Sequence, residues 1–192
     1  MLQHLLLYDD IIDNVYQHLC ITFSQYNNTT MEQYTIPPNT HIGHVHLKVS
    51  DLQRSIDFYC GLLGFELMVK YGTQAAFISA GGYHHHIGLN TWHSKGQPPA
   101  PVTAPGLYHT AILYPERKDL AIILQRLIDA KYPITGASDH GVSEAIYLDD
   151  PDGNGVELYW DRPRDQWPKD DNGDLTMFTQ ALDLHGLLAL AK

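Results

Sequence analysis

One arrangement of secondary structure occurs twice along this chain, and it constrains the fold more than any other feature of the sequence. Residues 41–92 and 106–161 each begin with a strand-like segment, continue into an amphipathic helix and end with three shorter strand-like segments. A repeated unit often builds its functional site where the copies meet. The sequence therefore predicts an α+β fold made of two paired βαβββ modules.

The first module shows the periodicities that this fold requires. Apolar and polar residues alternate over residues 45–49, as in a half-buried strand. Asp51 then predicts the start of a helix, because its side chain can cap free backbone N–H groups, and Gly64 predicts its end. The apolar face of this helix consists of Leu52, Ile56, Tyr59 and Leu63. Three strands separated by glycine turns are expected next, over residues 65–71, 75–80 and 84–90.

The second module repeats this plan after a linker rich in proline and glycine. A strand is predicted over residues 108–114 and a helix over residues 117–131. Three more strands are predicted over residues 133–135, 144–148 and 155–160. The last two are joined by the sequence Asp-Asp-Pro-Asp-Gly-Asn, whose residue types are typical of a tight turn.

The segments on either side of the modules have a different character. Residues 1–35 lack alternating strands and helices, and Met31 is a second plausible start, so we expect a dispensable N-terminal appendage. The modules form one domain over residues 36–163. Residues 164–192 form a C-terminal tail that is weakly helical from Leu175 and is expected to wrap the surface.

The composition argues against several classes of partner. The net charge at pH 7 is −10, which is unfavourable for binding the phosphates of nucleic acid. No apolar run approaches the roughly 18 residues needed to cross a membrane, and the start lacks the features of a secretion signal. The two cysteines, Cys20 and Cys60, form no CxxC motif and no disulfide framework. We therefore expect a cytoplasmic protein without nucleic-acid or membrane partners.

Histidine is as common as lysine and arginine combined, with 12 residues of each group, and neutral imidazole is the commonest metal ligand. When the two modules are superimposed on their first strands, His44 falls on His109, whereas His46 falls on Ala111. The second module adds Glu157, whose strand neighbours point to the core, and a carboxylate there needs a partner. Two imidazoles and one carboxylate form the facial triad that typically binds Fe(II). The sequence therefore predicts a metal site of His44, His109 and Glu157.

Each of these residues also has a simpler explanation. A single histidine on a strand is more often a hydrogen-bonded core residue than a ligand, and a single glutamate is usually solvated or paired with a cation. The matching positions of the two histidines favour the metal site. His46 has the same orientation on its strand as His44, so it is the alternative ligand.

Three segments resemble the vicinal oxygen chelate superfamily, which includes glyoxalases, fosfomycin-resistance transferases and extradiol ring-cleaving dioxygenases. These segments are residues 44–52, 58–65 and 150–157. The resemblance covers about residues 41–161, and it implies that the paired modules form a curved mixed sheet around a metal site. Because one fold serves many reactions, the function has to be argued from the site.

Within this superfamily the chain is most similar to the extradiol dioxygenases of the catechol 2,3-dioxygenase type. These enzymes have a histidine in a strand of the first metal-binding module, which resembles His85, and a histidine and a tyrosine ahead of the glutamate, which resemble His140 and Tyr147. The resemblance implies catalytic roles for these three residues, a catechol-like diol and dioxygen as substrates, and iron, Fe(2+), as the metal, with Mn, Ni or Zn as substitutes. A histidine can transfer protons and a tyrosine can hydrogen-bond a substrate oxygen. Alternatively, residues 84–86 form a polar edge strand and Tyr147 is a core aromatic residue with a bonded hydroxyl.

Other functions of the superfamily remain as alternatives. Glyoxalase I, an isomerase-type lyase, resembles this fold but has a second glutamate ligand in its first module, and this chain has no Asp or Glu between Glu66 and Glu116. A thiol transferase needs cations for its phosphonate substrate, and Lys70 and Lys95 are the only two in that region. A non-catalytic binding protein of this fold lacks the metal residues. Extradiol enzymes usually carry two module pairs, and the single pair here leaves sheet edges that predict a homodimer.

Overall fold

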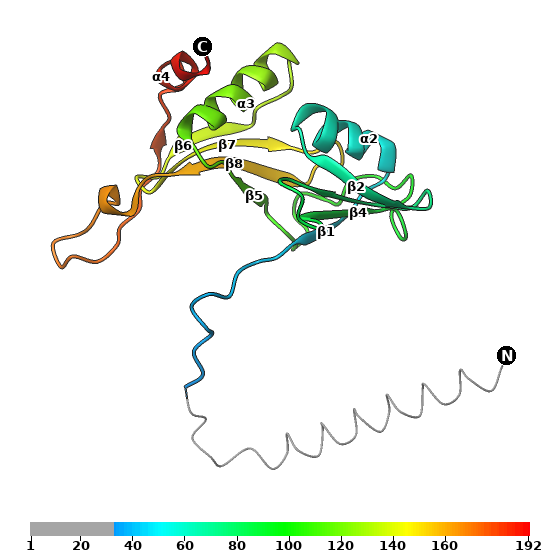
Figure 1. Cartoon of the computed structure of the whole chain (residues 1–192), viewed down its shortest axis with the longest axis horizontal. Helices are drawn as coiled ribbons and strands as arrows, with labels where there is room; N and C mark the ends of the chain where they lie inside the picture. Colours follow the sequence, from blue (N-terminus) through cyan, green and yellow to red (C-terminus); the bar gives the residue numbers. More distant parts are fainter. Residues whose placement is uncertain (1–32) are drawn as a thin grey trace. The chain divides into compact units, whose positions relative to one another are not determined.

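The computed structural model describes residues 33–192 (Figure 1). Residues 33–41 belong to one unit of the chain and contain no helix or strand, whereas residues 42–192 form a second unit with both modules. Most of the predicted N-terminal appendage, including Met31, lies outside the described residues. None of the helices in the described part of the chain is long and apolar enough to cross a membrane.

The first module folds in the predicted order of elements. It contains β1 (Val45–Lys48), α2 (Leu52–Ile56), a π-helix (Asp57–Leu62), β2 (Glu66–Tyr71), β3 (Ala75–Ser79) and β4 (Ile87–Asn90). The strand order is β1-β4-β3-β2, in which β1 and β4 are parallel and the other pairs are antiparallel. Asp51 caps α2 as predicted, because its carboxylate accepts a hydrogen bond from the backbone N–H of Arg54 at 3.1 Å.

The first predicted helix is not α-helical throughout. After α2 the backbone widens into the π-helix, and the N–H of Leu63 donates to the carbonyl of Phe58 at 2.9 Å. The guanidinium of Arg126, in the second module, donates to the carbonyls of Gly61 at 2.6 Å and Leu62 at 2.7 Å. Arg126 thus satisfies carbonyl groups that a helix end leaves free, and it ties the two modules together.

The second module contains β5 (Thr110–Leu113), α3 (Arg117–Asp129), β6 (Gly136–Asp139), β7 (Ser143–Asp149) and β8 (Gly155–Asp161). Its sheet has the order β5-β8-β7-β6-β9, where β9 (Gln180–Ala181) comes from the C-terminal segment. The strand predicted over residues 133–135 lies instead at β6. The register with β7 begins at Gly136, opposite Tyr147, and the N–H of Thr135 also donates to the carbonyl of Tyr147 at 2.8 Å. Pro133, which has no N–H to donate, lies before this paired region.

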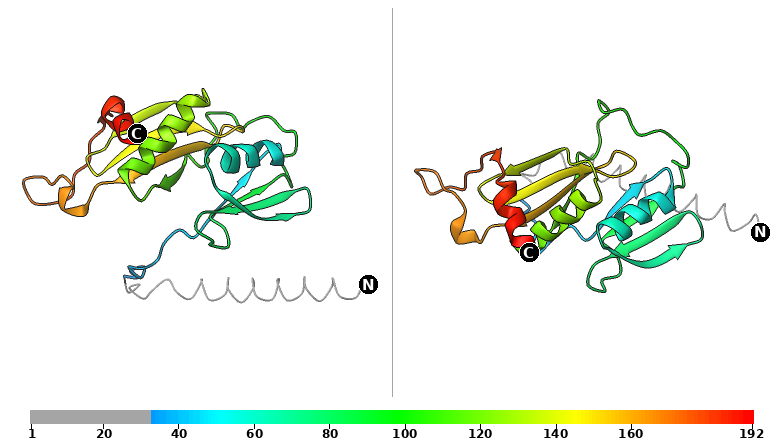
Figure 2. Two further views of the ribbon diagram at one scale, coloured as in Figure 1. Left: turned by 45° about the horizontal axis from the view of Figure 1, so that its top comes forward. Right: turned by 90° about the horizontal axis from the view of Figure 1, so that it is seen from above.

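Helices α2 and α3 lie on the same side of the sheets (Figure 1, Figure 2). The hydrophobic core fills the space between these helices and the sheets and continues through both modules. Its fully buried members include Val49, Ile78, Leu89, Leu120, Leu124, Ile146 and Leu158. Because side chains alternate along a strand, the residues beside Ile146 and Leu158 face away from the helices.

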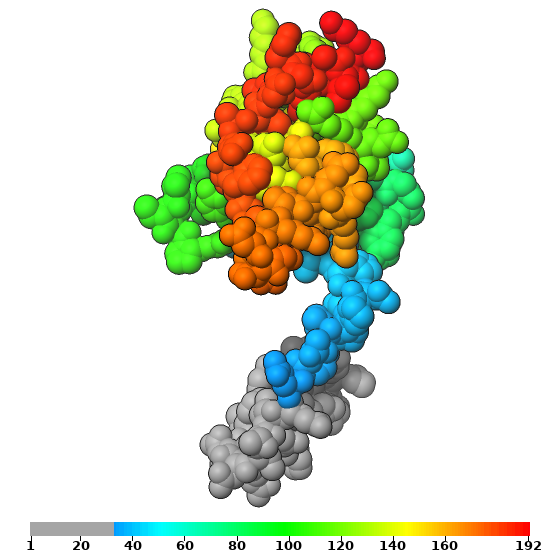
Figure 3. All heavy atoms as spheres, turned by 90° about the vertical axis from the view of Figure 1, so that its left-hand side faces the viewer, coloured from blue at the N-terminus to red at the C-terminus, as the bar shows by residue number. Residues whose placement is uncertain are grey.

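The C-terminal segment adds to both the sheet and the core. It begins with a 3₁₀-helix (Arg164–Gln166), continues through β9, which pairs with β6, and ends in α4 (Leu184–Leu188) and a last 3₁₀ turn (Ala189–Ala191) against α3. Leu182 and Leu187 are buried in the core. The space-filling view shows this segment, coloured orange to red, against the second sheet (Figure 3). The helix expected from Leu175 therefore begins later, at Leu184, because Leu175 forms a β-bridge with Lys169 and Gln180–Ala181 pair with β6.

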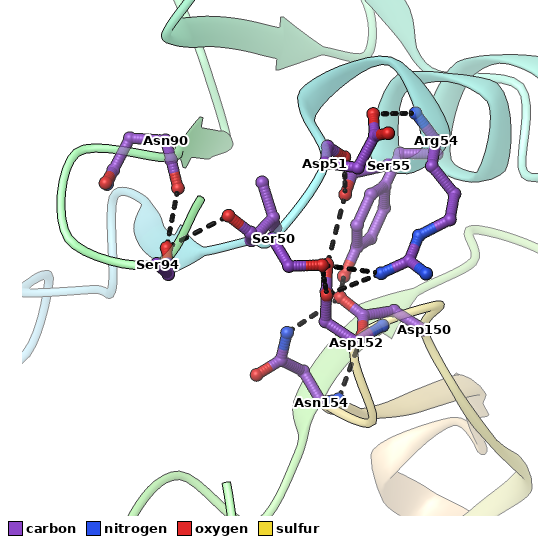
Figure 4. A network of polar contacts seen from close by, with 11 residues as sticks. Ser50, Asp51, Arg54, Ser55, Asn90, Ser94, Asp150, Asp152 and Asn154 are labelled. Atoms are coloured by element: carbon purple, nitrogen blue, oxygen red, sulfur yellow. Dashed lines mark hydrogen bonds and ion pairs between the residues drawn. The ribbon is translucent and has the colours of Figure 1, made fainter. Parts of the chain in front are cut away.

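A polar network joins α2 to the turn between β7 and β8 (Figure 4). Asp152 accepts a hydrogen bond from the hydroxyl of Ser50 at 2.6 Å and pairs with the guanidinium of Arg54, also at 2.6 Å. The buried hydroxyl of Tyr59 donates to Asp150 at 3.1 Å. Burial, followed by the charge of Asp150, raises the pKa of Tyr59, so its hydroxyl remains a donor at neutral pH. This turn therefore holds the strand of Glu157 against the first module.

Tyr59→Phe is expected to destabilise the fold, because it removes this buried hydrogen bond while keeping the aromatic ring. A hydrogen bond to a charged group contributes about 1.5–3 kcal/mol, so the free energy of unfolding measured with a denaturant should fall by a comparable amount. The matched control is Tyr132→Phe, whose hydroxyl donates to the carbonyl of Asp149 at 2.8 Å at a more exposed site. Equal losses in both variants would contradict a special contribution of the Tyr59–Asp150 contact.

Candidate active site

Four of the predicted site residues form one chain of contacts in the second module. Glu157 lies at its centre: its Oε2 is 2.9 Å from Nε2 of His109, and its Oε1 accepts a hydrogen bond from the hydroxyl of Tyr147 at 3.0 Å. The same hydroxyl lies 2.8 Å from Nε2 of His140. The structure thus connects the predicted acid/base residue His140 and the predicted substrate-orienting residue Tyr147 with two predicted metal ligands.

The strand register explains why Tyr147 and Glu157 meet. Tyr147 on β7 lies directly opposite Glu157 on β8, so the two side chains stand on the same face of the sheet. Their strand neighbours Ile146 and Leu158 are fully buried on the other face. This arrangement confirms the alternation that the sequence predicted for both strands.

The two repeat-matched histidines occupy equivalent positions. Each directly precedes the first strand of its module, His44 before β1 and His109 before β5, so each lies at the strand end rather than within the predicted strand. Gly155 allows His109 to approach β8. A Cβ at that position would collide with the carbonyl oxygen of Tyr108 and lie 3.1 Å from Cβ of His109.

His44 lies in a second cluster, which is confined to the first module. Its ring centroid is 4.4 Å from that of His85, and Nδ1 of His85 is 2.8 Å from Nδ1 of His84. His85 was predicted within a strand, and the structure corrects this. Gly81 and Gly82 both have positive φ, and the turn they form delays the start of β4 until Ile87.

The alternative ligand His46 packs among aromatic rings. Its ring centroid is 5.5 Å from that of Trp92 and 5.8 Å from that of Phe77. Desolvation, followed by the nearby His44, lowers the pKa of both His46 and His85. These histidines are therefore mainly neutral at neutral pH.

The first-module and second-module clusters are separate in this structure. Among residues 33–192, no group of three or more His, Cys, Asp or Glu side chains is close enough to hold one metal ion. His109 and Glu157 meet as two ligands of one ion would, whereas His44 contacts His85. Two imidazoles and a carboxylate suit a divalent transition metal by their chemistry. The inclusion of His44 in the ligand set stays a prediction.

The electrostatics around Tyr147 define its chemical role. Burial, followed by the charge of Glu157 and the hydrogen bond to it, raises the pKa of Tyr147 to about 12. The hydroxyl is therefore protonated at neutral pH. Its single proton can be donated to Glu157, to Nε2 of His140 or to a substrate oxygen placed between them.

No sequence pattern pointed to the residues on the other side of His140. Nδ1 of His140 lies 3.1 Å from the carbonyl oxygen of Phe178 and 3.3 Å from the hydroxyl of Thr179. These residues come from the C-terminal segment, which was expected only to wrap the surface. Their approach to His140 depends on the pairing of β9 with β6, and a short exposed strand of this kind carries no distinct periodicity.

The model of the Glyoxalase/Bleomycin resistance protein/Dioxygenase superfamily matches residues 41–158, which include both modules. The chain belongs to this superfamily. The resemblance to vicinal oxygen chelate proteins and the α+β fold of paired modules are therefore confirmed. A solved glyoxalase/dioxygenase from Nostoc punctiforme has the same fold, with a TM-score of 0.56 and 20% identity over 70% of this chain and 100% of that chain.

Two curated relatives are dioxygenases by name. Catechol-2,3-dioxygenase from Bacillus subtilis (strain 168) is 46% identical over 154 residues, which cover 80% of this chain and 53% of that protein. Biphenyl-2,3-diol 1,2-dioxygenase 2 from Rhodococcus globerulus is 34% identical over 122 residues, which cover 62% of this chain and 61% of that protein. The chain thus spans between half and two thirds of the length of these relatives.

Proposed function

We propose that this chain is an extradiol-type dioxygenase that opens the ring of a catechol-like aromatic diol with dioxygen. The observation that carries the proposal is the contact chain from His140 through Tyr147 and Glu157 to His109. His140 and Tyr147 can take part in proton transfer, and Glu157 and His109 can bind a metal. The contact chain brings these two kinds of group together. The 46% identity to a catechol-2,3-dioxygenase supports this chemistry, and the activity of a chain whose match covers only 53% of that relative is part of the proposal.

The proposed metal ligands are His44, His109 and Glu157, and the proposed metal is Fe(II). When bound, such an ion would supply redox chemistry and leave coordination positions open for a diol and dioxygen. Mn, Ni or Zn can bind to the same ligands, because the affinity of such a site for divalent metals does not by itself select iron. The ligand set draws on both modules, so metal binding also depends on their pairing.

The remaining site residues act on protons. Tyr147 hydrogen-bonds a substrate oxygen and orients the diol, since its hydroxyl is a protonated donor. His140 exchanges a proton through Nε2, which already faces that hydroxyl at 2.8 Å. His85, beside His44, is the proposed second acid/base group, on the side of the first module. A diol has two hydroxyl protons to lose, so two acceptors are useful.

The proposal includes a cytoplasmic homodimer without nucleic-acid or membrane partners. Support for self-association comes from β2, which is the edge strand of the first sheet. All six of its residues are exposed, including Leu67, Val69 and Tyr71. Exposed apolar edge strands favour pairing with another chain.

Oxygen uptake with a panel of catechols tests this function. After anaerobic loading with Fe(II), the protein is expected to consume dioxygen and form the yellow ring-cleavage product of at least one catechol. A glyoxalase-like isomerase or lyase, or a thiol transferase, would turn over its substrate without oxygen, and a non-catalytic protein would bind without turnover. Product formation at an undiminished rate under anaerobic conditions would contradict the proposal.

A further inference from the structure

The C-terminal segment holds His140 from the side opposite Tyr147. The backbone N–H of Phe178 donates to the carbonyl of His140 at 3.3 Å, and the carbonyl of Phe178 lies 3.1 Å from Nδ1 of the His140 ring. The hydroxyl of Thr179 lies 3.3 Å from the same nitrogen. Immediately afterwards β9 pairs with β6, which ends directly before His140. The imidazole is thus held between the C-terminal segment and Tyr147.

The chemistry of these partners decides where the imidazole proton lies. A carbonyl oxygen can only accept a hydrogen bond, so its contact with Nδ1 requires that Nδ1 carries the proton. In the neutral ring Nε2 then has a free lone pair. This lone pair faces the hydroxyl of Tyr147 at 2.8 Å and competes with Oε1 of Glu157, at 3.0 Å, for the single proton of that hydroxyl. Without such a partner, the neutral histidine side chain in water prefers the proton on Nε2, which would block this acceptor.

The packing around Gly141 keeps the C-terminal segment in place. Gly141 follows His140 with φ of +79°, a conformation that favours glycine. A Cβ at Gly141 would lie 2.6 Å from the ring of Phe178 and 2.8 Å from the ring of Pro168. The two rings therefore occupy the space that any larger residue would need. The chain can bring Phe178 to His140 only because residue 141 has no side chain.

We propose that Phe178, supported by Gly141, is a positioning residue that fixes the tautomer of His140 with its proton on Nδ1. The Nε2 atom is thereby kept as the proton acceptor that faces Tyr147. The consequence for turnover rests on the proposed dioxygenase function. The tautomer itself is a property of the folded chain and can be measured without substrate.

Nitrogen-15 NMR of the imidazole rings in the full chain tests this inference, since the shifts of Nδ1 and Nε2 distinguish the tautomers of a neutral ring. The chain has 12 histidines, so the signals of His140 are assigned by their loss in His140→Gln. We expect the proton on Nδ1 in the native chain. Thr179→Val should keep this tautomer, because the carbonyl of Phe178 remains.

Gly141→Ala should displace the ring of Phe178 and shift His140 toward the Nε2–H tautomer. The matched control is Gly173→Ala, which also replaces a glycine of positive φ, +86°, but places its Cβ in open space. It should leave the tautomer unchanged. Phe178→Ala, which removes the ring that packs on Gly141, gives a second way to loosen the contact if Gly141→Ala does not fold.

Several results would overturn the inference. The first is a native chain in which the His140 proton lies on Nε2. The second is a His140 tautomer that stays the same in both Gly141→Ala and Phe178→Ala. The third is a loss of the Nδ1–H tautomer in Thr179→Val.

In a folded Gly141→Ala variant we also expect kcat for a catechol to fall by about 10-fold or more, toward the 10²–10⁴ range of acid–base catalysis. If neither the native chain nor any variant turned over a catechol, that result would count against the proposed function. The inference about Phe178 would still be decided by the measured tautomer of His140.

Discussion

Glu157→Ala is expected to abolish stoichiometric binding of a divalent metal ion. Glu157 is the proposed anionic ligand, and its Oε2 meets Nε2 of His109 at 2.9 Å. Removing it leaves two neutral imidazoles, which bind a divalent ion far more weakly than a full facial triad does. His109→Ala and His44→Ala should have the same effect. The measurement is elemental analysis after anaerobic loading with Fe(II) and removal of free metal, with one ion per chain expected in the native protein.

His46→Ala is the matched control for these variants. His46 lies two residues after His44 and has the same strand orientation, but its ring packs against Trp92 and Phe77. It should therefore keep one metal ion per chain. Loss of metal in His46→Ala together with retention in His44→Ala would show that the alignment of the two modules is wrong by two residues.

His140→Ala should reduce turnover of a catechol by about 10²–10⁴, the usual contribution of general acid–base catalysis. The reason is that Nε2 of His140 is the proton acceptor nearest to the hydroxyl of Tyr147. Tyr147→Phe removes only a hydrogen bond near charge, which costs about 1–3 kcal/mol, so its effect on kcat should be smaller. Steady-state kinetics with one catechol at saturating oxygen measures both variants.

Both variants should retain the full complement of metal, because neither residue is a proposed ligand. Loss of the metal in His140→Ala would make this histidine a ligand. Unchanged kinetics in both variants would remove their proposed roles and leave the function supported by the metal site alone.

The positions of most site residues were predictable because they follow from short-range patterns. The two-residue period placed Glu157 and Tyr147 on the face opposite Leu158 and Ile146, and the β7–β8 hairpin then brings the two polar side chains together. The repeat predicted equivalent positions for His44 and His109 in their modules, and the structure has both directly before the first strand. Asp51 was recognisable as a helix cap by its residue type.

The features that were not predicted depend on contacts between distant segments. The π-helix is closed by Arg126 of the other module, and no local pattern in residues 57–62 shows this. The position of Phe178 beside His140 depends on β9, a strand of two residues. The separation of His44 from His109 and Glu157 likewise depends on how the two modules pack, which their internal periodicities do not determine.

The central claim is that this chain inserts dioxygen into an aromatic diol, and isotope labelling tests it most directly. The Fe(II)-loaded protein is supplied with a catechol under ¹⁸O₂, and the ring-cleavage product is analysed by mass spectrometry with rapid quenching. The account predicts a ring-opened product that carries both atoms of one labelled dioxygen molecule, and no such product from Glu157→Ala. A product formed without any labelled oxygen would contradict the account.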